Sequence, residues 1–389
     1  MESEVTPTAH VIAEPTTDSA TAPISKLEDD TSRQLTRIWQ ELLGVESVGL
    51  DQNYFDLGGD SVLAVRLFAQ IEKVFKVKLP LATLFEAPTI HELAQVLRNE
   101  VPSSGWSPLV AIQPSGSRPP FFCIHGAGGN VLIYRELSQH LGPDQPFYGL
   151  QSQGLDGASP PLTRIEDMAA LYLKAIRSEQ PHGPYFIGGY CGGGLIAYEV
   201  AQRLEGAGEE VALLALLDTM NFSHIPPLSA WSRSYYSCER VGFHAANFLL
   251  LDFNGKFSFF REKIQVLRNR LPVWWGMILA KFEKKTGPPN SESRVLGNIW
   301  QANDLACQKY VPKPFPGIVT DFRPLKQYRA FDKPDTKWDQ LALQGQTIVV
   351  LPVYPAGMLL EPFVKHLAAA LKVAIDKARQ VTSPAHQDH

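Results

Sequence analysis

Hydrophobic positions divide the chain into two parts with different periodicities. In residues 32–98 the apolar side chains recur at helical spacing, which predicts three amphipathic helices that begin near Ser32, Ser61 and His91. Thr89, just before the third helix, has the character of an N-cap. The apolar stripes of the first two helices are Leu35, Ile38, Trp39, Leu42 and Leu43, and Leu63, Leu67, Ile71 and Val74. This part of the chain is therefore predicted to be an all-α bundle.

From residue 117 onward, short apolar runs alternate with helical patterns. Residues 211–217 form a continuous apolar run, which is typical of a central parallel strand that is covered on both faces. Alternation of this kind predicts a doubly wound α/β domain, in which functional groups lie at the carboxyl ends of the strands. The other expected strands are 121–124, 145–151, 317–323 and 347–351, and the expected helices are 168–178, 195–204 and 362–375.

Three stretches depart from these patterns. Residues 1–31 and 101–116 are rich in Pro, Ser and other linker residues and have no apolar periodicity. Residues 222–307 interrupt the α/β alternation with aromatic and basic helical stretches at 235–248 and 257–282. We therefore expect a disordered linker at 1–31, a helical domain at 32–100, a linker at 101–116, an α/β domain at 117–380 and a tail at 381–389. A linker-like beginning suggests the tail of a longer polypeptide.

Composition narrows the classes of function. Apolar residues make up 44% of the chain and charged residues 20%, as in globular proteins, and the net charge of -4 offers no basic surface for nucleic acid. The four cysteines are scattered without a C-x-x-C pair, which argues against a disulfide framework or a metal site and fits a reducing cytosol. The longest apolar candidate, 271–279, is too short to span a bilayer. We expect a cytoplasmic protein without metal, nucleic-acid or membrane partners.

A glycine-rich turn carries the strongest chemical signal. Gly189 and Gly193 flank Cys191 at the spacing G-x-S-x-G, between a short apolar run and a helical pattern, which is the context of a nucleophile elbow. Such a turn holds the nucleophile at positive φ, exposes its side chain and aims the Gly192 amide at a developing oxyanion. The alternative is a turn around a buried structural cysteine.

Ser61 closes the segment Leu57-Gly58-Gly59-Asp60-Ser61 at the start of a predicted helix. Taken alone, a serine there is an ordinary helix cap. Residues 32–98, however, resemble the carrier domains of nonribosomal peptide and polyketide synthases, whose attachment motif this segment matches. The resemblance implies that a phosphopantetheinyl transferase attaches 4′-phosphopantetheine to Ser61. A helix N-terminus favours such an anion, and Asp56 and Asp60 offer charge to basic partner enzymes.

The second part, residues 107–377, resembles the type I thioesterases that terminate such synthases, members of the α/β-hydrolase superfamily. The resemblance implies that Cys191 is the nucleophile and that the amides of Ala127, in H-G-A-G-G, and Gly192 form the oxyanion hole. Asp218, after the run 211–217, matches the family's acid, although a strand-end or capping aspartate is the alternative. The implied fold is a four-helix-type bundle followed by an α/β-hydrolase domain with a mostly parallel sheet and a helical lid at 222–307.

The family's histidine is missing from its expected place. The family carries it shortly before an M-L-x-E-P segment, here residues 358–362, yet residues 352–357 contain none, and the position falls on Pro355, Ala356 or Gly357. A loss of the base, a base from elsewhere, and a domain that no longer catalyses are the three explanations. His244 in the lid is the preferred replacement. The other candidates are His125, His224 and His366.

These features together predict chain release. An acyl or peptidyl thioester on the phosphopantetheine of Ser61 would be transferred to Cys191 and released by hydrolysis or cyclisation, with upstream synthase domains as partners. The alternative is a carrier fused to a catalytically degenerate hydrolase domain that binds or gates the chain. The sequence leaves open the identity of the acyl chain and the route of release.

Overall fold

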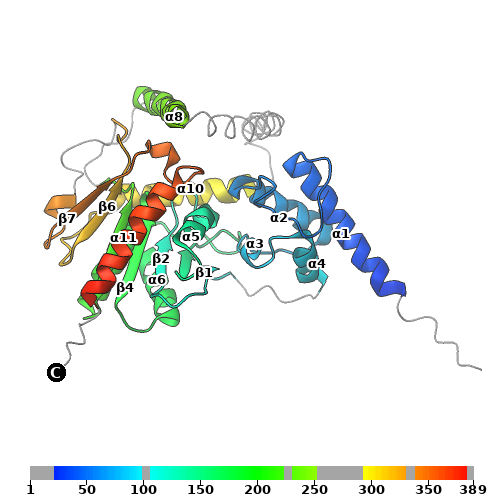
Figure 1. Ribbon diagram of the computed structural model, residues 1–389, viewed down its shortest axis with the longest axis horizontal. Helices are drawn as coiled ribbons and strands as arrows, with labels where there is room; N and C mark the ends of the chain where they lie inside the picture. Colours follow the sequence, from blue (N-terminus) through cyan, green and yellow to red (C-terminus); the bar gives the residue numbers. More distant parts are fainter. Residues whose placement is uncertain (1–21, 99–105, 223–229, 252–291, 330–337, 383–389) are drawn as a thin grey trace, which may run out of the picture.

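The computed structural model describes residues 22–98, 106–222, 230–251, 292–329 and 338–382 (Figure 1). Its N-terminal part is a small helical bundle around Trp39, Tyr54 and Ile71, which are fully buried. The predicted four-helix character is confirmed, with a short third helix that the apolar periodicity did not indicate. The helices are α1 (Ala22–Leu43), α2 (Ser61–Phe75), α3 (Thr83–Glu86) and α4 (Ile90–Arg98).

The ends of these helices follow local chemistry. Thr89 and Glu92 form a capping box at α4, since Thr89 Oγ1 accepts the Glu92 N–H at 3.2 Å and Glu92 Oε2 accepts the Thr89 N–H at 3.1 Å. The predicted cap is confirmed. Helix α1 begins at Ala22, ten residues before the expected start and inside the expected linker. Pro23 falls in its first turn, where a helix has no intrahelical N–H bond to lose.

The second part contains a seven-stranded sheet with the strand order β1-β3-β2-β4-β5-β6-β7. All described pairings are parallel except that of β1 with β3, so the predicted mostly parallel sheet is confirmed. The edge strand β1 was not predicted: it lies within 101–116, so the expectation of a linker there is wrong for residues 109–113, which pair with β3. The strands are β1 (Leu109–Gln113), β2 (Phe121–Ile124), β3 (Phe147–Leu150), β4 (Tyr185–Tyr190), β5 (Val211–Leu217), β6 (Val319–Arg323) and β7 (Gln346–Val350).

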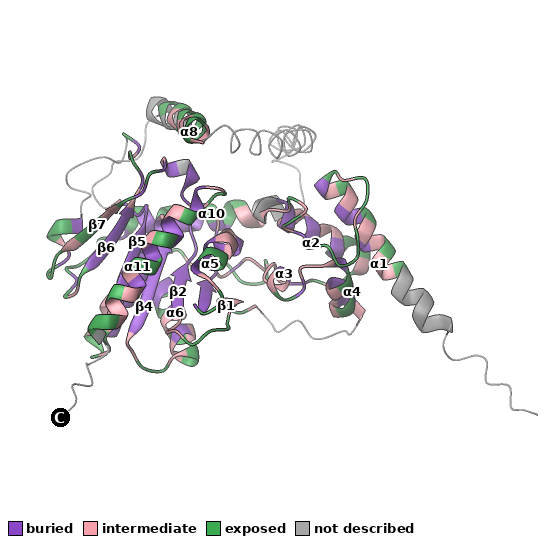
Figure 2. Cartoon of the chain, in the orientation of Figure 1, coloured by how far each residue is buried: buried purple, intermediate pink, exposed green. Residues whose placement is uncertain are grey.

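Helices cover both faces of the sheet, and the buried side chains gather between the layers (Figure 2). One face is covered by α6 (Ile165–Glu179), α7 (Gly192–Gly206) and α10 (Glu292–Lys309). The other is covered by α5 (Arg135–Leu141) and α11 (Val364–Thr382). Three 3₁₀ turns complete the described fold, namely η1 (Leu132–Tyr134), η3 (Trp338–Gln340) and η4 (Pro355–Gly357). None of the helices in the described ranges is long and apolar enough to cross a membrane.

The expected lid divides into different structures. Its stretch 235–248 lies within α8 (Ala230–Leu250), which packs on η4. The stretch 257–282, with its paired tryptophans, lies outside the described residues. The last part of the expected lid is in α10, and Ala306 and Cys307 of this helix are buried in the core with α6 and α7. The end of the expected lid therefore belongs to the body of the α/β domain.

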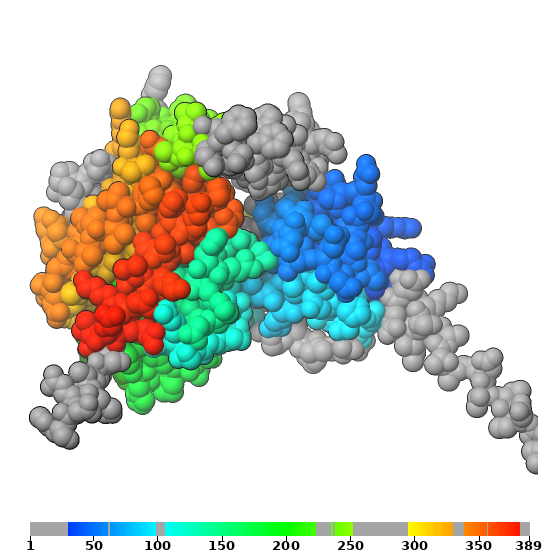
Figure 3. All heavy atoms as spheres, in the orientation of Figure 1, coloured from blue at the N-terminus to red at the C-terminus, as the bar shows by residue number. Residues whose placement is uncertain are grey.

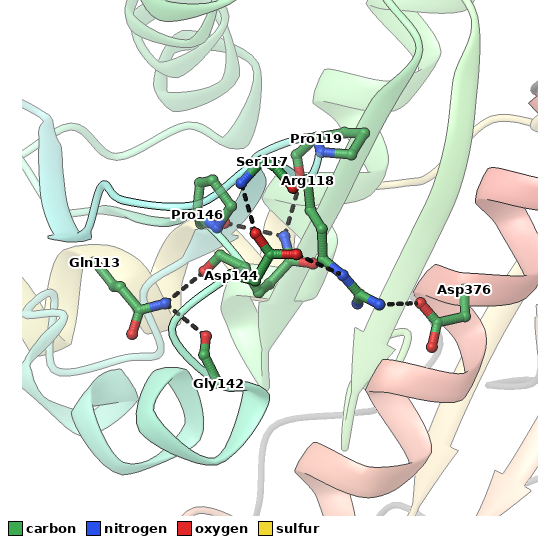
Figure 4. A network of polar contacts seen from close by, with 9 residues as sticks. Gln113, Ser117, Arg118, Pro119, Gly142, Asp144, Pro146 and Asp376 are labelled. Atoms are coloured by element: carbon green, nitrogen blue, oxygen red, sulfur yellow. Dashed lines mark hydrogen bonds and ion pairs between the residues drawn. The ribbon is translucent and has the colours of Figure 1, made fainter.

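A polar network holds the edge strand to the rest of the domain (Figure 4). Asp144 accepts the Ser117 N–H at 2.8 Å, which lowers the pKa of its carboxyl. Arg118 pairs with Asp144 at 3.6 Å and with Asp376 of α11 at 2.8 Å. Gln113 at the end of β1 donates to the carbonyl oxygens of Gly142 and Gln145. The connection from β1 to β2 is thereby fastened to the loop before β3 and to α11.

The helical bundle packs directly on the α/β domain (Figure 3). The Arg135 guanidinium lies 4.4 Å from the centre of the Phe55 ring and 3.5 Å from Asp56 Oδ1. Leu132 of the α/β domain is buried in the core cluster of the bundle. Between the two parts lies a cavity of about 410 Å³, whose walls include Val65 and Phe68 of α2, Trp106, and Val295 and Leu296 of α10.

Candidate active site

Cys191 occupies a sharp turn between a strand and a helix. It follows the last residue of β4 and is the N-cap of α7, with φ +53° and ψ -120°. The predicted positive φ is confirmed. Its N–H donates to the carbonyl oxygen of Leu217 at 2.9 Å, so the backbone stays attached to β5 while the side chain turns out of the sheet. The thiol is partly exposed, in contrast to the fully buried Cys123.

The glycines around Cys191 allow α7 to approach the sheet closely. A β-carbon at Gly189 would collide with the backbone of Gly193, and one at Gly193 would collide with the carbonyl oxygens of Ile124 and His125. These obstacles are backbone atoms, which cannot move aside as a flexible side chain can. The G-x-C-x-G spacing is therefore a packing requirement at the crossing of β2, β4 and α7.

The thiol of Cys191 lies in a negative environment. Burial raises its pKa to about 11, with further contributions from the charges of Asp218 and Asp304, while a hydrogen bond from the Gly192 N–H lowers it. None of the described groups that shift this pKa is a cation. The thiol therefore stays protonated near neutral pH, and its attack on a carbonyl requires a base.

Asp218 stands next to Cys191 at the carboxyl ends of adjacent strands. Tyr190 of β4 pairs with Leu217 of β5, so Cys191 and Asp218 are the following positions on the two strands, which lie about 4.8 Å apart. Asp218 also has a positive φ of +47°, and its N–H donates to the carbonyl oxygen of Phe322 at 2.9 Å. Its side chain is only 7% exposed, and among the described residues its Oδ1 has no hydrogen-bond partner.

A second buried carboxylate, Asp321 of β6, lies near Asp218. Burial raises the pKa of Asp218 to about 7, and the charge of Asp321 adds to the shift. Asp321 Oδ2 accepts from Arg323 Nε at 2.6 Å and from Gln346 Nε2 at 2.8 Å. The positive charge of Arg323 is thus engaged by Asp321. Asp218 titrates near neutral pH because burial and the charge of Asp321 raise its pKa.

Ala127 and Gly192, the two expected oxyanion donors, lie on neighbouring turns. Gly192 begins α7 beside the thiol, and the loop after β2 lies close to the end of β4, since a β-carbon at Gly126 would be 3.2 Å from the Tyr190 ring. Asn303 of α10 donates to the carbonyl oxygen of Ala127 at 3.0 Å and braces this loop. That both amides serve one oxyanion stays a prediction.

Cys307 of α10 is the residue that sequence reasoning did not connect with the site. A β-carbon on Gly192 would lie 2.7 Å from Cys307 Sγ, so this second thiol packs directly on the elbow. Burial raises its pKa, and the neighbouring Cys191 contributes to the shift. The spacing of Ile299, Asn303 and Cys307 puts all three on one face of α10, and this stripe was the available signal.

His125 is a structural residue. It is buried, and its Nδ1 donates to the carbonyl oxygen of Gly126 at 2.7 Å while Nε2 lies 2.7 Å from the Tyr172 hydroxyl. Because Nδ1 carries the proton, Nε2 accepts from Tyr172. Burial lowers the pKa of His125 to about 4, so the ring is neutral and both nitrogens are used. His366 lies on α11, and burial followed by the charge of Lys365 lowers its pKa. His224 lies outside the described residues.

His244 lies on α8 with an exposed side chain. Its neighbour Phe243 stacks on Tyr354 at 5.5 Å, and Asn247 exchanges two hydrogen bonds with the Tyr354 backbone, at 2.9 and 3.3 Å. These contacts fasten α8 to the loop in which the family's histidine was expected. No histidine of the described ranges is among the groups that shift the pKa of Cys191. The role of His244 as base stays a prediction, and it requires α8 to turn or move.

Ser61 is the first residue of α2, but it is not the cap. Asp60 Oδ1 accepts the Leu63 N–H at 2.9 Å, so Asp60 caps the helix. A β-carbon at Gly59 would collide with the ring of Tyr54, whose hydroxyl donates to the carbonyl oxygen of Asp60 at 3.3 Å. Asp60 therefore caps α2 and Gly59 makes room for Tyr54, so Ser61 is not needed as the helix cap.

The structure thus brings Cys191, Gly192, Asp218 and the Ala127 loop together, and adds Asp304, Cys307 and Asp321 around them. Ser61 lies in the other domain, and His244 lies on the exposed side of α8. Within the described ranges, no cluster of His, Cys, Asp and Glu side chains could hold a metal ion.

Each of the two parts of the chain matches a known protein family. Residues 33–97 match the family described as Phosphopantetheine attachment site, and residues 119–225 match the Thioesterase domain family. The first match contains Ser61, and the second contains Ala127, Cys191 and Asp218.

Two curated relatives are a synthetase and a peptide synthase. Malpinin synthetase of Mortierella alpina is 45% identical over 187 residues, and a dimodular nonribosomal peptide synthase of Bacillus subtilis (strain 168) is 40% identical over 192. These alignments cover 48% and 49% of this chain but only 2% and 8% of the relatives. The chain therefore corresponds to a small part of their length.

A solved structure resembles almost the whole chain. The crystal structure of holo-AB3403, a four-domain nonribosomal peptide synthetase bound to AMP and glycine, aligns with 97% of this chain and 27% of its own. The TM-score is 0.54 and the sequence identity is 25%. The similarity extends over the helical bundle and the α/β domain together.

Proposed function

Because the chain joins a phosphopantetheine carrier domain to a thioesterase domain, we propose that it releases the finished chain from a nonribosomal peptide or polyketide assembly line. The observation that carries the proposal is Cys191, a partly exposed thiol held at positive φ between β4 and the N-terminus of α7. This is the geometry that acyl transfer to a nucleophile needs.

The carrier residues fit the prosthetic group. Ser61 Oγ would hold 4′-phosphopantetheine, whose terminal thiol supplies the thioester to be cleaved. The first turn of α2 would favour the phosphodiester, because backbone N–H groups and the dipole at a helix N-terminus attract an anion. Asp60 already caps the helix, so modification of Ser61 leaves the cap in place.

In the thioesterase domain, Cys191 Sγ attacks the thioester carbonyl. The oxyanion that forms is held by the amides of Ala127 and Gly192, and collapse breaks the carbon–sulfur bond to the arm. The arm leaves as a thiol, and the acyl group remains on Cys191. Water or a nucleophile within the acyl chain then attacks this new thioester, which gives hydrolysis or cyclisation.

Upstream synthase domains and a phosphopantetheinyl transferase are the proposed protein partners, and the acyl or peptidyl thioester is the proposed substrate. The length of the relatives supports the upstream domains, since this chain matches only a few per cent of them. We also propose a cytoplasmic location, in keeping with four cysteines that are all free thiols.

The test is a single-turnover transfer followed by intact mass and peptide mapping. A phosphopantetheinyl transferase with an acyl coenzyme A should add one acyl-phosphopantetheine mass at Ser61, and Ser61→Ala should prevent it. The acyl mass should then appear on the Cys191 peptide. Cys191→Ala should keep the group on Ser61 without unfolding the domain, because the thiol is partly exposed.

A degenerate thioesterase domain is the second candidate function. It is favoured by the absence of a histidine from residues 352–357 and by the protonated state of the Cys191 thiol. Such a domain would bind or gate the chain without accepting it. Acyl mass that remains on Ser61 of the wild-type protein, with none on Cys191 at long times, would support this function and contradict release.

A further inference from the structure

We infer that Asp218 itself takes the proton from Cys191, so that the site works as a cysteine–aspartate pair with no imidazole between them. The inference rests on the proposed acyl transfer and gives Asp218 a role different from that of the family's acid, which only orients a histidine. Four features of the structure support it: strand register, an unpartnered carboxylate oxygen, the charges that face Asp218, and the state of the thiol.

The register of β4 and β5 makes the two side chains neighbours. Tyr190 pairs with Leu217, so Cys191 and Asp218 follow as the next two positions at the carboxyl edge of the sheet. Both residues have positive φ, and both N–H groups continue the ladder, that of Cys191 to Leu217 and that of Asp218 to Phe322. The two turns leave the sheet at the same level, and the charge of Asp218 acts on the thiol.

The carboxylate of Asp218 has an oxygen available for a proton. The side chain is nine-tenths buried, and Oδ1 has no hydrogen-bond partner among the described residues. A buried carboxylate oxygen without a donor is unusual, because the loss of water is normally compensated by a hydrogen bond. In a histidine-containing relative the imidazole would donate to this carboxylate. The thiol does not donate to Oδ1 in the resting structure, and the inference gives it that place during attack, since the charge of Asp218 already acts on it.

The charges around Asp218 set the pH at which it accepts a proton. Asp321 and Arg323 face it from β6, with the guanidinium bound to Asp321, while α10 contributes Asp304 on the side of the thiol. No described cation pairs with Asp218, whose pKa is about 7. A base that titrates near the working pH combines a substantial ionised fraction with basicity, which is the most efficient combination.

The thiol pKa of about 11 indicates how the proton moves. Complete transfer to Asp218 before attack would be uphill, so the proton leaves Sγ as the bond from Sγ to the carbonyl carbon forms. The carbonyl electron pair moves to the oxygen that Ala127 and Gly192 hold. When the tetrahedral adduct collapses, the bond to the arm's sulfur breaks and that sulfur takes the proton from Asp218. The carboxylate is regenerated.

The substitution Asp218→Asn distinguishes a base from a residue that only supports the fold, because it should slow acyl transfer and speed alkylation of Cys191. Single-turnover transfer of the acyl group from Ser61 to Cys191 should fall by roughly 10²–10⁴-fold, since the base is gone. Alkylation of Cys191 by iodoacetamide at pH 7 should rise several-fold, because removing a neighbouring negative charge lowers the pKa of the thiol. A residue that only supports the fold would lower both.

Asp304→Asn is the matched control. It removes another carboxylate that raises the pKa of Cys191, so alkylation should rise there too. Acyl transfer should not fall, because Asp304 belongs to α10 and is not the base. Equal behaviour of the two variants in acyl transfer would overturn the inference, as would an Asp218→Asn protein that transfers as fast as wild type or that loses both reactions.

A second variant tests the same idea without touching Asp218. The charge of Asp321 raises the pKa of Asp218, so Asp321→Asn should move the acid limb of the transfer rate from near pH 7 to lower pH. An unmoved limb would contradict the inference. Wild-type protein that never carries acyl mass on Cys191 would contradict the proposed function instead, so the two failures are distinguishable.

Discussion

At the scale of single residues, the chemistry of this site is governed by carboxylates. Asp218 and Asp304 raise the pKa of the Cys191 thiol, and Asp321 raises that of Asp218. Cys191 could be identified from the sequence by the spacing of Gly189 and Gly193 around it, and Asp218 because it directly follows an apolar run. Asp304 and Asp321 could not, since they reach the site from α10 and β6, and apolar periodicity does not say which elements become neighbours. For Cys307 the stripe on α10 was the available signal.

The four cysteines should label at different rates. With iodoacetamide at pH 7, we expect the exposed Cys238 to react first, Cys191 next, and the buried Cys123 and Cys307 last. Because the pKa of Cys191 is about 11, its rate should rise about tenfold for each pH unit up to pH 10. Peptide mapping at several times measures all four sites. Labelling of Cys191 no faster than that of Cys123 would argue against an accessible elbow.

Ala356 is the position at which a histidine can be supplied. Ala356→His should raise the rate of acyl transfer to Cys191, because η4 follows the last strand, where the superfamily carries its base. The plot of rate against pH should gain a limb near the ordinary histidine pKa of about 6.5.

The same assay on His244→Ala identifies the present base. A fall of roughly 10²–10⁴-fold would assign that role to the lid histidine and contradict direct proton transfer to Asp218.

At the scale of elements, the sequence predicted most accurately the strands that are buried on both faces of the sheet. The run 211–217 coincides with β5, because a continuous apolar stretch has few alternatives to a central strand. The edge strand β1 was missed because it is short and half-exposed. Helix α10 was expected as part of the lid, since its amphipathic pattern does not reveal that its apolar face rests on α7 or that Asn303 donates to the Ala127 carbonyl oxygen.

The crossing of α7 over β2 and β4 is testable with two glycines of the same helix. Gly193→Ala should destabilise the thioesterase domain by roughly 1–3 kcal/mol or more, because the new β-carbon meets the carbonyl oxygens of Ile124 and His125. Gly206→Ala, at the open end of α7, should be neutral or stabilising by up to about 1 kcal/mol. Urea denaturation measures both. Equal midpoints would contradict the close approach.

At the scale of the whole molecule, the described contacts between the two domains are both apolar and charged. Arg135 lies over Phe55 and beside Asp56, and because Asp56 is exposed, this ion pair contributes little, about 0–1 kcal/mol. The ring contact adds roughly 0.5–2 kcal/mol. That two domains exist was evident from the sequence, whereas their docking was not, because it depends on side chains far apart in the chain.

Arg135→Ala should therefore weaken docking without affecting the chemistry. We expect slower acyl transfer from Ser61 to Cys191, by several-fold, and an unchanged rate from a small soluble acyl thioester that needs no carrier. Arg164→Ala, which removes an exposed arginine paired only with Glu166 among the described residues, is the control and should change neither rate. A loss of both rates in Arg135→Ala would show that the residue supports the thioesterase fold instead of the interface.

Residues of both domains line the cavity between them. This affects where the chain can be cut when its domains are joined to those of another synthetase. A thioesterase domain cut between α4 and β1 and joined to a foreign carrier would keep Val295 and Leu296 but lose Val65 and Phe68 from the opposite wall. The engineered junction would then fall across a packed surface. We expect the unit that can be moved between assembly lines to be the pair of domains, with the cut before Ala22, where α1 begins.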